Sequence, residues 1–180
     1  MAYYIDDFKK TAVKAEGKVI YGWNHESRRF DLPVSDPTPK NRMERTSDFE
    51  ARRYLFEHDP RKCYERIWTL ADKVQARPDA ADEDTITVER AEADLKDAEA
   101  FKEEVLPEAL ILQSAVDEYG MAMSDVGRCL SNCFKILESD IQLARNGMEL
   151  AKLKEFVKKC ESGHCEECPY YRACDKKKEN

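Results

Sequence analysis

A chain of 180 residues is long enough for one domain with a hydrophobic core, or for one domain with a small appendage. Its composition, 42% hydrophobic and 37% charged with only six glycines and seven prolines, favours long helices over many short strands. No run approaches about 20 apolar residues, and no basic segment precedes an apolar one at the start, so we expect neither a membrane span nor a secretory signal. Seven cysteines in such a chain indicate the reducing cytoplasm, where clustered thiols are more often metal ligands than disulfide partners.

Negative charge is concentrated in the centre of the chain. Residues 1–78 carry 16 Lys/Arg and 13 Asp/Glu, residues 79–119 carry 3 and 14, and residues 120–180 carry 11 and 10. The excess behind the net charge of −7 therefore lies in residues 79–119. Such a run is either the solvated face of a helix or an electronegative surface that meets a basic partner or imitates nucleic acid.

The first forty residues combine three short patterns. Residues 3–16 place apolar side chains on one face of a short helix that ends at Gly17. The β-rich stretches "VIYGW" and "RRFDL" flank the polar "NHES", which is compatible with a small β-hairpin. Three prolines between residues 33 and 39 indicate a loop. We therefore expect residues 1–40 to form an N-terminal helix, a β-hairpin and a proline-rich loop.

Residues 41–157 have the pattern of a helical bundle. Ser47 and Glu50 have the spacing of a capping box at the start of a short helix. Asp59, followed by a proline, marks the start of a second helix over residues 60–76. The predicted buried stripe of this second helix consists of Cys63, Ile67, Leu70, Ala71 and Val74.

The strongest periodicity runs from residue 85 to residue 119. Apolar residues alternate in steps of three and four over more than four heptads, which is typical of a long helix with a coiled-coil-like seam. Pro107 either kinks this helix or starts a second one. Ser124 caps the next helix after the short "YGMAM", so the two helices form a central antiparallel αα-hairpin. The "RNG" at residues 145–147 predicts a stop before a final helix. The predicted fold class is mainly α.

Four of the seven cysteines lie within fifteen residues, namely Cys160, Cys165, Cys168 and Cys174. In this C-x4-C-x2-C-x5-C spacing, the C-x2-C pair forms a tight knuckle that directs two sulfurs at one ion about 2.3 Å away. The outer cysteines complete a tetrahedral shell, in which His164 could replace Cys160 or Cys165. We therefore expect residues 158–180 to form a short metal-binding tail with a structural Zn2+. Free redox-sensitive thiols or two disulfides are the alternative.

An iron–sulfur cluster is the other candidate metal centre, because four cysteines also bind a 4Fe–4S cluster. The ten residues of the C-x2-C-x5-C part resemble the cysteine tail of iron–sulfur exonucleases linked to recombination and CRISPR systems, and part of the auxiliary-cluster domains of radical enzymes. The resemblance implies a redox or nucleic-acid-processing role. Those exonucleases also need an aspartate and an E-x-K motif on neighbouring strands. Here the candidate is "EGK" at residues 16–18, which follows the predicted helix without a strand-borne aspartate before it.

No catalytic motif stands out. The chain has no glycine-rich phosphate loop, no G-x-S-x-G and no H-E-x-x-H, and its central carboxylates are spread around a helix. A dyad of His25 or His58 with Cys63 has no local signature. Cys129 and Cys133 are one helical turn apart, which suits half of a second metal site, a redox pair or core packing. We predict no catalytic residue, and a non-enzymatic role is favoured.

Positive charge in the N-terminal third is interleaved with aromatic residues. The cations are Arg28, Arg29, Lys40, Arg42, Arg45, Arg52, Arg53, Arg61, Lys62 and Arg66. The aromatic residues among them are Trp23, Phe30, Tyr54 and Trp68. Eight acidic residues between positions 28 and 66 reduce the positive excess to two. Direct binding of nucleic acid is therefore possible but not favoured.

These patterns favour a small cytoplasmic adaptor or regulatory protein, of a bacterial or phage accessory type, that binds another macromolecule and carries a structural zinc site. The expected partner is a protein, with a basic surface that suits the acidic segment. One alternative is an acidic inhibitor of the phage anti-defence type, which occupies a basic nucleic-acid-binding channel. Another is an iron–sulfur protein with a redox or nucleic-acid-processing role. The oligomeric state stays open, because a heptad-like seam can be satisfied within one chain or between chains.

Overall fold

The computed structural model of the chain describes residues 1–77 and 86–161. The chain divides into two compact units. Unit 1 comprises Met1–Arg77 and Val105–Lys135, and unit 2 comprises Pro78–Glu104 and Ile136–Asn180. The two long helices contribute one half to each unit. The coarse prediction of a mainly α fold is confirmed, and the β-structure is larger than the single hairpin that the sequence suggested.

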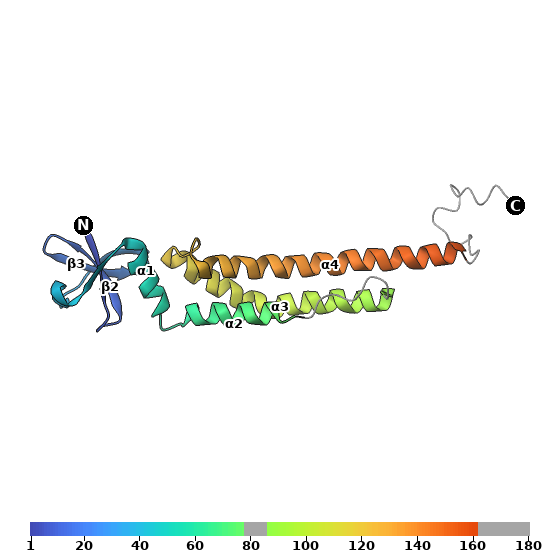
Figure 1. Cartoon of the computed structure of the whole chain (residues 1–180), viewed down its shortest axis with the longest axis horizontal. Helices are drawn as coiled ribbons and strands as arrows, with labels where there is room; N and C mark the ends of the chain where they lie inside the picture. The colour runs from blue at the N-terminus through green and yellow to red at the C-terminus, as the bar shows by residue number, and fades with distance from the viewer. Residues whose placement is uncertain (78–85, 162–180) are drawn as a thin grey trace. The chain divides into compact units, whose positions relative to one another are not determined.

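Unit 1 begins with a five-stranded antiparallel sheet of order β4-β3-β2-β1-β5 (Figure 1). The first four strands form a meander: β1 (Ala2–Asp6), β2 (Thr11–Glu16), β3 (Val19–Asn24) and β4 (Arg29–Pro33). A 3-10 turn, η1 (Lys40–Arg42), then leads into β5 (Glu44–Thr46), which returns to pair with β1. The predicted hairpin is confirmed as β3 and β4.

The predicted helix over residues 3–16 is wrong, because this segment forms β1 and β2. Phe8, one of the apolar residues of the predicted helix, is 91% exposed at the turn between the strands. The Asp6 carboxylate accepts the backbone N–H of Lys9 (3.1 Å) and so stabilises this turn. In strand geometry Val13 and Ala15 share one face of the sheet, where both are buried in a small cluster.

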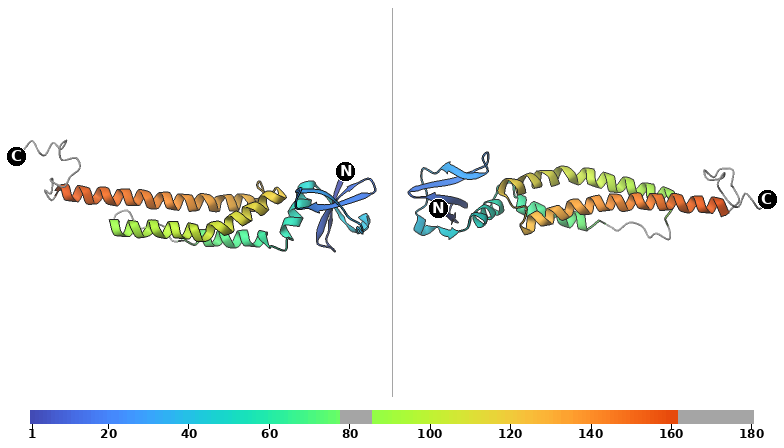
Figure 2. Two further views of the ribbon diagram at one scale, coloured as in Figure 1. Left: turned by 180° about the vertical axis from the view of Figure 1, so that it is seen from behind. Right: turned by 90° about the horizontal axis from the view of Figure 1, so that it is seen from above.

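Two short helices follow the sheet. In α1 (Asp48–Glu57) the Ser47 hydroxyl accepts the Glu50 N–H (3.1 Å), which confirms the predicted cap. The helix packs against β1 and β2 (Figure 2). In α2 (Cys63–Gln75) the whole predicted stripe is buried. The predicted N-cap of α2 is wrong, because Lys62 is the residue before the helix and Asp59 bonds to other groups described below.

The long αα-hairpin is confirmed as α3 (Val88–Tyr119) and α4 (Asp125–Glu161). The helix α3 runs on through Pro107. It ends at Tyr119 and is followed by Gly120, whose φ of +68° suits a residue without a Cβ. The Met121 N–H donates to the Val116 carbonyl (2.7 Å). None of the helices in residues 1–77 and 86–161 is long and apolar enough to cross a membrane.

In unit 2 the first half of α3 packs against the second half of α4. Their contact centres on small side chains, with Ala98, Ile141 and Ala144 buried and Leu95 beside them. The predicted stop at residues 145–147 is wrong, because α4 continues through it. A Cβ at Gly147 would lie 3.1 Å from Cδ1 of Ile86, so the glycine allows this close approach. An isolated glycine costs a helix only about 1 kcal/mol, which tertiary contacts can offset.

Candidate anion-binding cleft

A concave surface of unit 1 lies where the sheet meets α1, and we call it the basic cleft. Its volume is about 490 Å3. It is lined by Tyr3, Lys14, Trp23, Arg28, Arg29, Phe30, Asp31, Asp48 and Arg52. Four cations and two carboxylates therefore surround aromatic side chains. Four strands and one helix contribute to this set, so only the folded sheet brings it together.

The aromatic side chains of the basic cleft are fixed by ring contacts. Trp23 meets Phe30 edge-on, with centroids 5.1 Å apart, and stacks on Tyr119 at 5.5 Å. Only 9% of Trp23 and 5% of Phe30 is exposed. Both large faces of the indole are therefore largely covered, so the rings form a rigid floor rather than an open stacking platform.

Two hydrogen-bond donors at this floor have no acceptor. The indole Nε1–H of Trp23 and the Nε–H of Arg52 are buried and unpaired among the described residues. The remainder of the Arg52 guanidinium is held, since Nη1 donates to the Tyr119 carbonyl (3.2 Å) and Nη2 pairs with Asp48 (2.8 Å). A buried unpaired donor costs about 1 to 3 kcal/mol. A ligand that supplies acceptor oxygens would remove this cost.

The charges at the mouth of the cleft are only partly compensated. Lys14 pairs with Glu16 (2.8 Å) and lies 5.7 Å from the Tyr21 ring centroid. Arg28 makes no ion pair within the described part of the chain. It adopts a left-handed φ of +56° in the β3–β4 turn. The cleft thus keeps positive charge available to a ligand.

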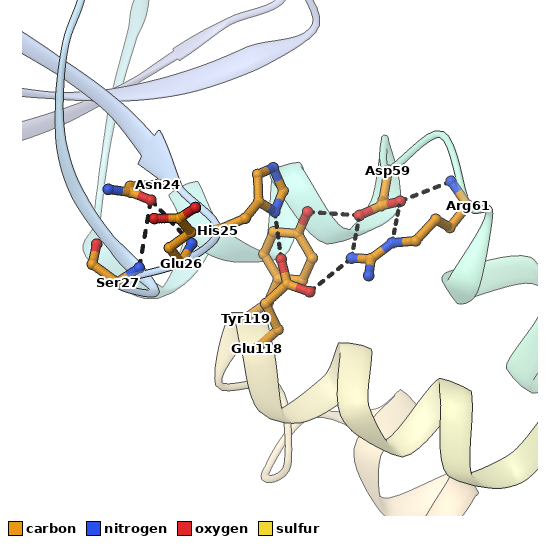
Figure 3. Close-up of polar contacts among 8 residues, drawn as sticks. All are labelled: Asn24, His25, Glu26, Ser27, Asp59, Arg61, Glu118 and Tyr119. Carbon is orange, nitrogen blue, oxygen red and sulfur yellow. Dashed lines mark hydrogen bonds and ion pairs between the residues drawn. The ribbon is translucent and has the colours of Figure 1, made fainter.

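A polar network anchors the floor of the cleft to the helices (Figure 3). Asp59, only 6% exposed, accepts the Tyr119 hydroxyl (2.6 Å) and two side-chain N–H groups of Arg61 (2.9 and 2.7 Å). Arg61 also reaches Glu118 (2.9 Å), which hydrogen-bonds the ring of His25. The β3–β4 turn is in this way tied to the end of α3.

The electrostatics of this network favour a structural role. Burial alone would raise the pKa of Asp59, but the hydrogen bonds from Arg61 and Tyr119 outweigh burial and lower the pKa to about 2. Burial and the bond to Asp59 raise the pKa of Tyr119. At neutral pH both groups therefore keep one protonation state, which does not suit a general acid or base. The network holds Tyr119 in place beneath Trp23.

The same turn is stabilised locally. The side-chain oxygen of Asn24 accepts the backbone N–H groups of Glu26 (3.0 Å) and Ser27 (3.4 Å), as Figure 3 shows. Hydrogen bonds from Ser27 and Asn24 lower the pKa of Asp31, and nearby Arg29 lowers it further. Hydrogen bonds on both sides of Arg28 and Arg29 therefore fix the backbone of the turn that carries these two arginines.

Most of the predicted metal ligands lie outside the residues that the structure describes. Cys160 lies near the end of α4, half-buried, whereas Cys165, Cys168, Cys174 and His164 lie outside the described residues. Residues 1–77 and 86–161 contain no group of three or more His, Cys, Asp or Glu side chains that could hold a metal. The metal-binding tail, with Zn2+ or a 4Fe–4S cluster, stays a prediction.

The remaining cysteines have packing positions. Cys63 and Cys133 are buried, as the packing interpretation expected. Burial and neighbouring Cys129 raise the pKa of Cys133 to about 11, so this thiol stays protonated at neutral pH. The described contacts pair neither His25 nor His58 with Cys63. His25 contacts Glu118, and His58 stacks on Tyr54 with ring centroids 4.0 Å apart.

The E-x-K motif does not assemble a nuclease site among the described residues. Glu16 ends β2, and Gly17 forms the turn into β3. Asp6 is the acidic residue on the neighbouring strand, but the register pairs it with Thr11, at the opposite end of β2 from Glu16. The predicted helix before this motif is also wrong, since Glu16 is the last residue of strand β2.

The sequence patterns predicted some of the residues that line the basic cleft but not others. Of the predicted cations, Arg28, Arg29 and Arg52 meet there with Trp23 and Phe30. Three others point elsewhere in unit 1, because Arg53, Arg61 and Arg66 bind Glu57, Glu118 and Glu108. Tyr3 and Lys14 were missed, since both lie in the segment that was predicted as a helix. Tyr119 lies at the end of α3, and no local pattern links it to the cleft.

The acidic segment is partly neutralised inside each unit. Glu108 binds Arg66 with two hydrogen bonds of 2.8 and 2.6 Å, and this contact lowers the pKa of Glu108. Glu118 binds Arg61, and in unit 2 Glu99 pairs with Arg145 at 3.4 Å. Each of these carboxylates is paired with a cation of its own unit. The inhibitor alternative, which needs a free electronegative surface, stays a prediction.

Comparisons with known proteins give no indication of the function. No protein-family model matches the sequence, and searches among curated proteins and solved structures found no similar protein.

Proposed function

We propose that this protein is an adaptor that binds an acidic segment of a protein partner in the basic cleft of unit 1. The observation that carries the proposal is the pair of buried donors without acceptors, on Trp23 and Arg52, in a cleft that Arg28 and Arg29 also line. Carboxylates accept such N–H groups, and guanidinium groups bind them through two parallel hydrogen bonds. A bound carboxylate would accept hydrogen bonds from the buried donors of Trp23 and Arg52. It would also neutralise the charges of Arg28 and Arg29.

Two features favour an acidic peptide over a nucleic acid. Single-stranded nucleic acids are commonly held by aromatic faces on which bases stack, and the faces of Trp23 and Phe30 are covered. Affinity for the phosphate backbone also depends on a basic surface. Unit 1 carries 18 Lys/Arg and 17 Asp/Glu, a net charge of only +1. Unit 1 as a whole therefore has almost no positive excess, whereas the lining of the cleft has two more cations than carboxylates, which suits a short acidic segment.

The test uses the fluorescence of Trp23. The chain has two tryptophans, and the second, Trp68, is 40% exposed, so a Trp68→Phe background isolates the signal from the cleft. We expect a short polyglutamate peptide to change this signal saturably, and added salt to weaken binding. Arg28→Ala with Arg29→Ala should weaken the affinity by about tenfold or more.

The matched control removes two cations outside the cleft. Arg42 and Arg45 are exposed and have no ion pair among the described residues, so Arg42→Ala with Arg45→Ala changes net charge equally. Equal loss of affinity in both double variants would indicate a general charge effect and contradict a built site. Binding of a single-stranded oligonucleotide without binding of the peptide would replace the proposal with nucleic-acid recognition. No change with either ligand would refute it.

We further propose that the C-terminal tail binds Zn2+ through Cys160 and the three cysteines that follow, as a structural site. Thiolate ligands in this spacing support the idea, and metal binding would add folding energy locally. Metal analysis of freshly purified protein should find one zinc per chain. A coloured, iron-containing preparation would favour the 4Fe–4S alternative. Chelation should loosen the tail while the circular dichroism signal of the helices largely remains; complete unfolding would contradict a separable tail.

A further inference from the structure

The second half of α4 is coloured orange to red in Figure 1. Its apolar residues lie on two faces of the helix. One packs within unit 2 and contains Ile141, Ala144 and Ala151, all at most 9% exposed. The other is open: Leu143 and Leu153 are 55% and 60% exposed, and Val157 is 51% exposed. The larger aliphatic side chains of this segment thus lie mainly on the open face, and the buried face is rich in alanine. Exposed apolar surface of this kind usually marks an interaction site.

The open face follows a heptad repeat. The repeat consists of Leu143, Asn146, Leu150, Leu153, Val157 and Cys160, in alternating steps of three and four. Leu150 and Cys160 are half-buried, and the other four are exposed. This spacing corresponds to positions a and d of a coiled coil, beginning with a at Leu143. Ile141, Ala144 and Ala151 then occupy positions f and b, on the opposite side of the helix. We call residues 143–160 the outer seam.

Charges beside the outer seam suit a parallel partner with the same sequence. Glu149 occupies a g position and Lys154 the next e position. In a parallel, in-register pair, g of one helix faces the following e of the other, so Glu149 would meet Lys154 of a second copy twice by symmetry. In an antiparallel pair with full overlap, Glu149 would instead face Phe156, and Lys154 would face Gly147. Only the parallel arrangement pairs the charges.

We propose that the outer seam of α4 pairs in parallel with the outer seam of a second copy of this chain. The interface would cover Leu143, Leu153 and Val157 and add aliphatic contacts to those of the alanine-rich inner face. Because Cys160 is a d residue, the two chains would place their C-terminal cysteine tails next to each other. This inference is independent of the basic cleft.

The oligomeric state of the full chain tests the proposal. We expect sedimentation equilibrium to show a reversible dimer. The double change Leu143→Gln and Leu153→Gln should raise the dissociation constant by about a hundredfold or more, because it removes two apolar contacts from each chain. The matched control changes Leu110 and Ile111 to Gln, since these α3 residues are 55% and 53% exposed and lie off the seam. The control should dimerise like the wild type, and circular dichroism should show unchanged helix content in all three proteins.

A charge reversal tests the parallel register. Glu149→Lys should weaken the dimer because it places two lysines opposite each other, and adding Lys154→Glu in the same chain should restore it. A dimer that the second change does not restore would overturn the parallel arrangement. A chain that stays monomeric up to high micromolar concentrations would overturn the second copy as the occupant, and would favour another segment of the same chain. A dimer that survives the two leucine substitutions would place the interface elsewhere.

Discussion

Unit 1 and unit 2 each contain ion pairs across their elements, but the surroundings of these pairs differ. In unit 1 Asp59 is 6% exposed and accepts bonds from Arg61 and Tyr119 within a sheet–helix core. In unit 2 the pair of Arg145 and Glu99 spans 3.4 Å with about half of each side chain exposed. Buried pairs interact strongly and are costly to break, whereas water and salt screen exposed pairs. We therefore expect stability to depend on polar contacts in unit 1 and hardly at all in unit 2.

The largest expected effect is the loss of Asp59. Asp59→Ala leaves the buried Tyr119 hydroxyl without its acceptor and removes the main partner of Arg61, which should lower the free energy of unfolding by about 3 kcal/mol. Urea denaturation followed by circular dichroism would measure it. Asp36→Ala, which changes an exposed aspartate of the same unit, is the control and should have little effect. Similar losses from both variants would contradict the structural role of the network.

Two helical glycines offer the next comparison. A Cβ at Gly127 in unit 1 would lie 2.3 Å from the Met121 carbonyl oxygen, so Gly127→Ala must displace backbone and should cost at least about 2 kcal/mol. A Cβ at Gly147 in unit 2 would meet only the end of the Ile86 side chain at 3.1 Å. There the helix propensity of alanine, about 1 kcal/mol, should offset the contact. Thermal unfolding should show a lower midpoint for Gly127→Ala than for Gly147→Ala. Equal destabilisation by the two changes would contradict this prediction.

Acid should weaken unit 1 through Asp59. Its folded-state pKa of about 2 lies below the ordinary value, so its stabilising contribution is complete above about pH 4 and is lost as the pH falls toward 2. The loss should reach about 2 kcal/mol. Unfolding free energies of wild type and Asp59→Asn, measured across this range, should converge as the pH decreases. A constant difference down to pH 2 would show that the carboxylate does not titrate there.

The smallest expected effect is in unit 2. Arg145→Ala removes an exposed ion pair and should change the free energy of unfolding by less than about 0.5 kcal/mol. The measurement should be made at low and at physiological salt, since screening should remove even this difference. A loss comparable to that of Asp59→Ala would mean that unit 2 also depends on a tightly held polar contact.

Local signals predicted much of the helical structure. The Ser47 cap and the apolar stripe of α2 depend on contacts within a few residues, and both are confirmed. The prediction over residues 3–16 was wrong because a short apolar pattern fits both a helix and a pair of strands. Asp59 was assigned as a cap because its sequence neighbours favour that role. Its carboxylate instead accepts N–H groups of Arg61, two residues away, and the hydroxyl of Tyr119, 60 residues away.

The sequence by itself determined the long αα-hairpin, because heptad spacing and the short turn at Gly120 depend on near neighbours. It also placed Trp23, Phe30 and the arginines in one region of the chain. Only the tertiary structure decided that Arg28, Arg29 and Arg52 line one cleft, whereas Arg61 and Arg66 are bound by carboxylates of α3. Asp59 accepts the hydroxyl of Tyr119, 60 residues away, and Arg52 donates to the backbone carbonyl of Tyr119, 67 residues away. Such contacts arise from the packing of whole elements, which no local periodicity encodes.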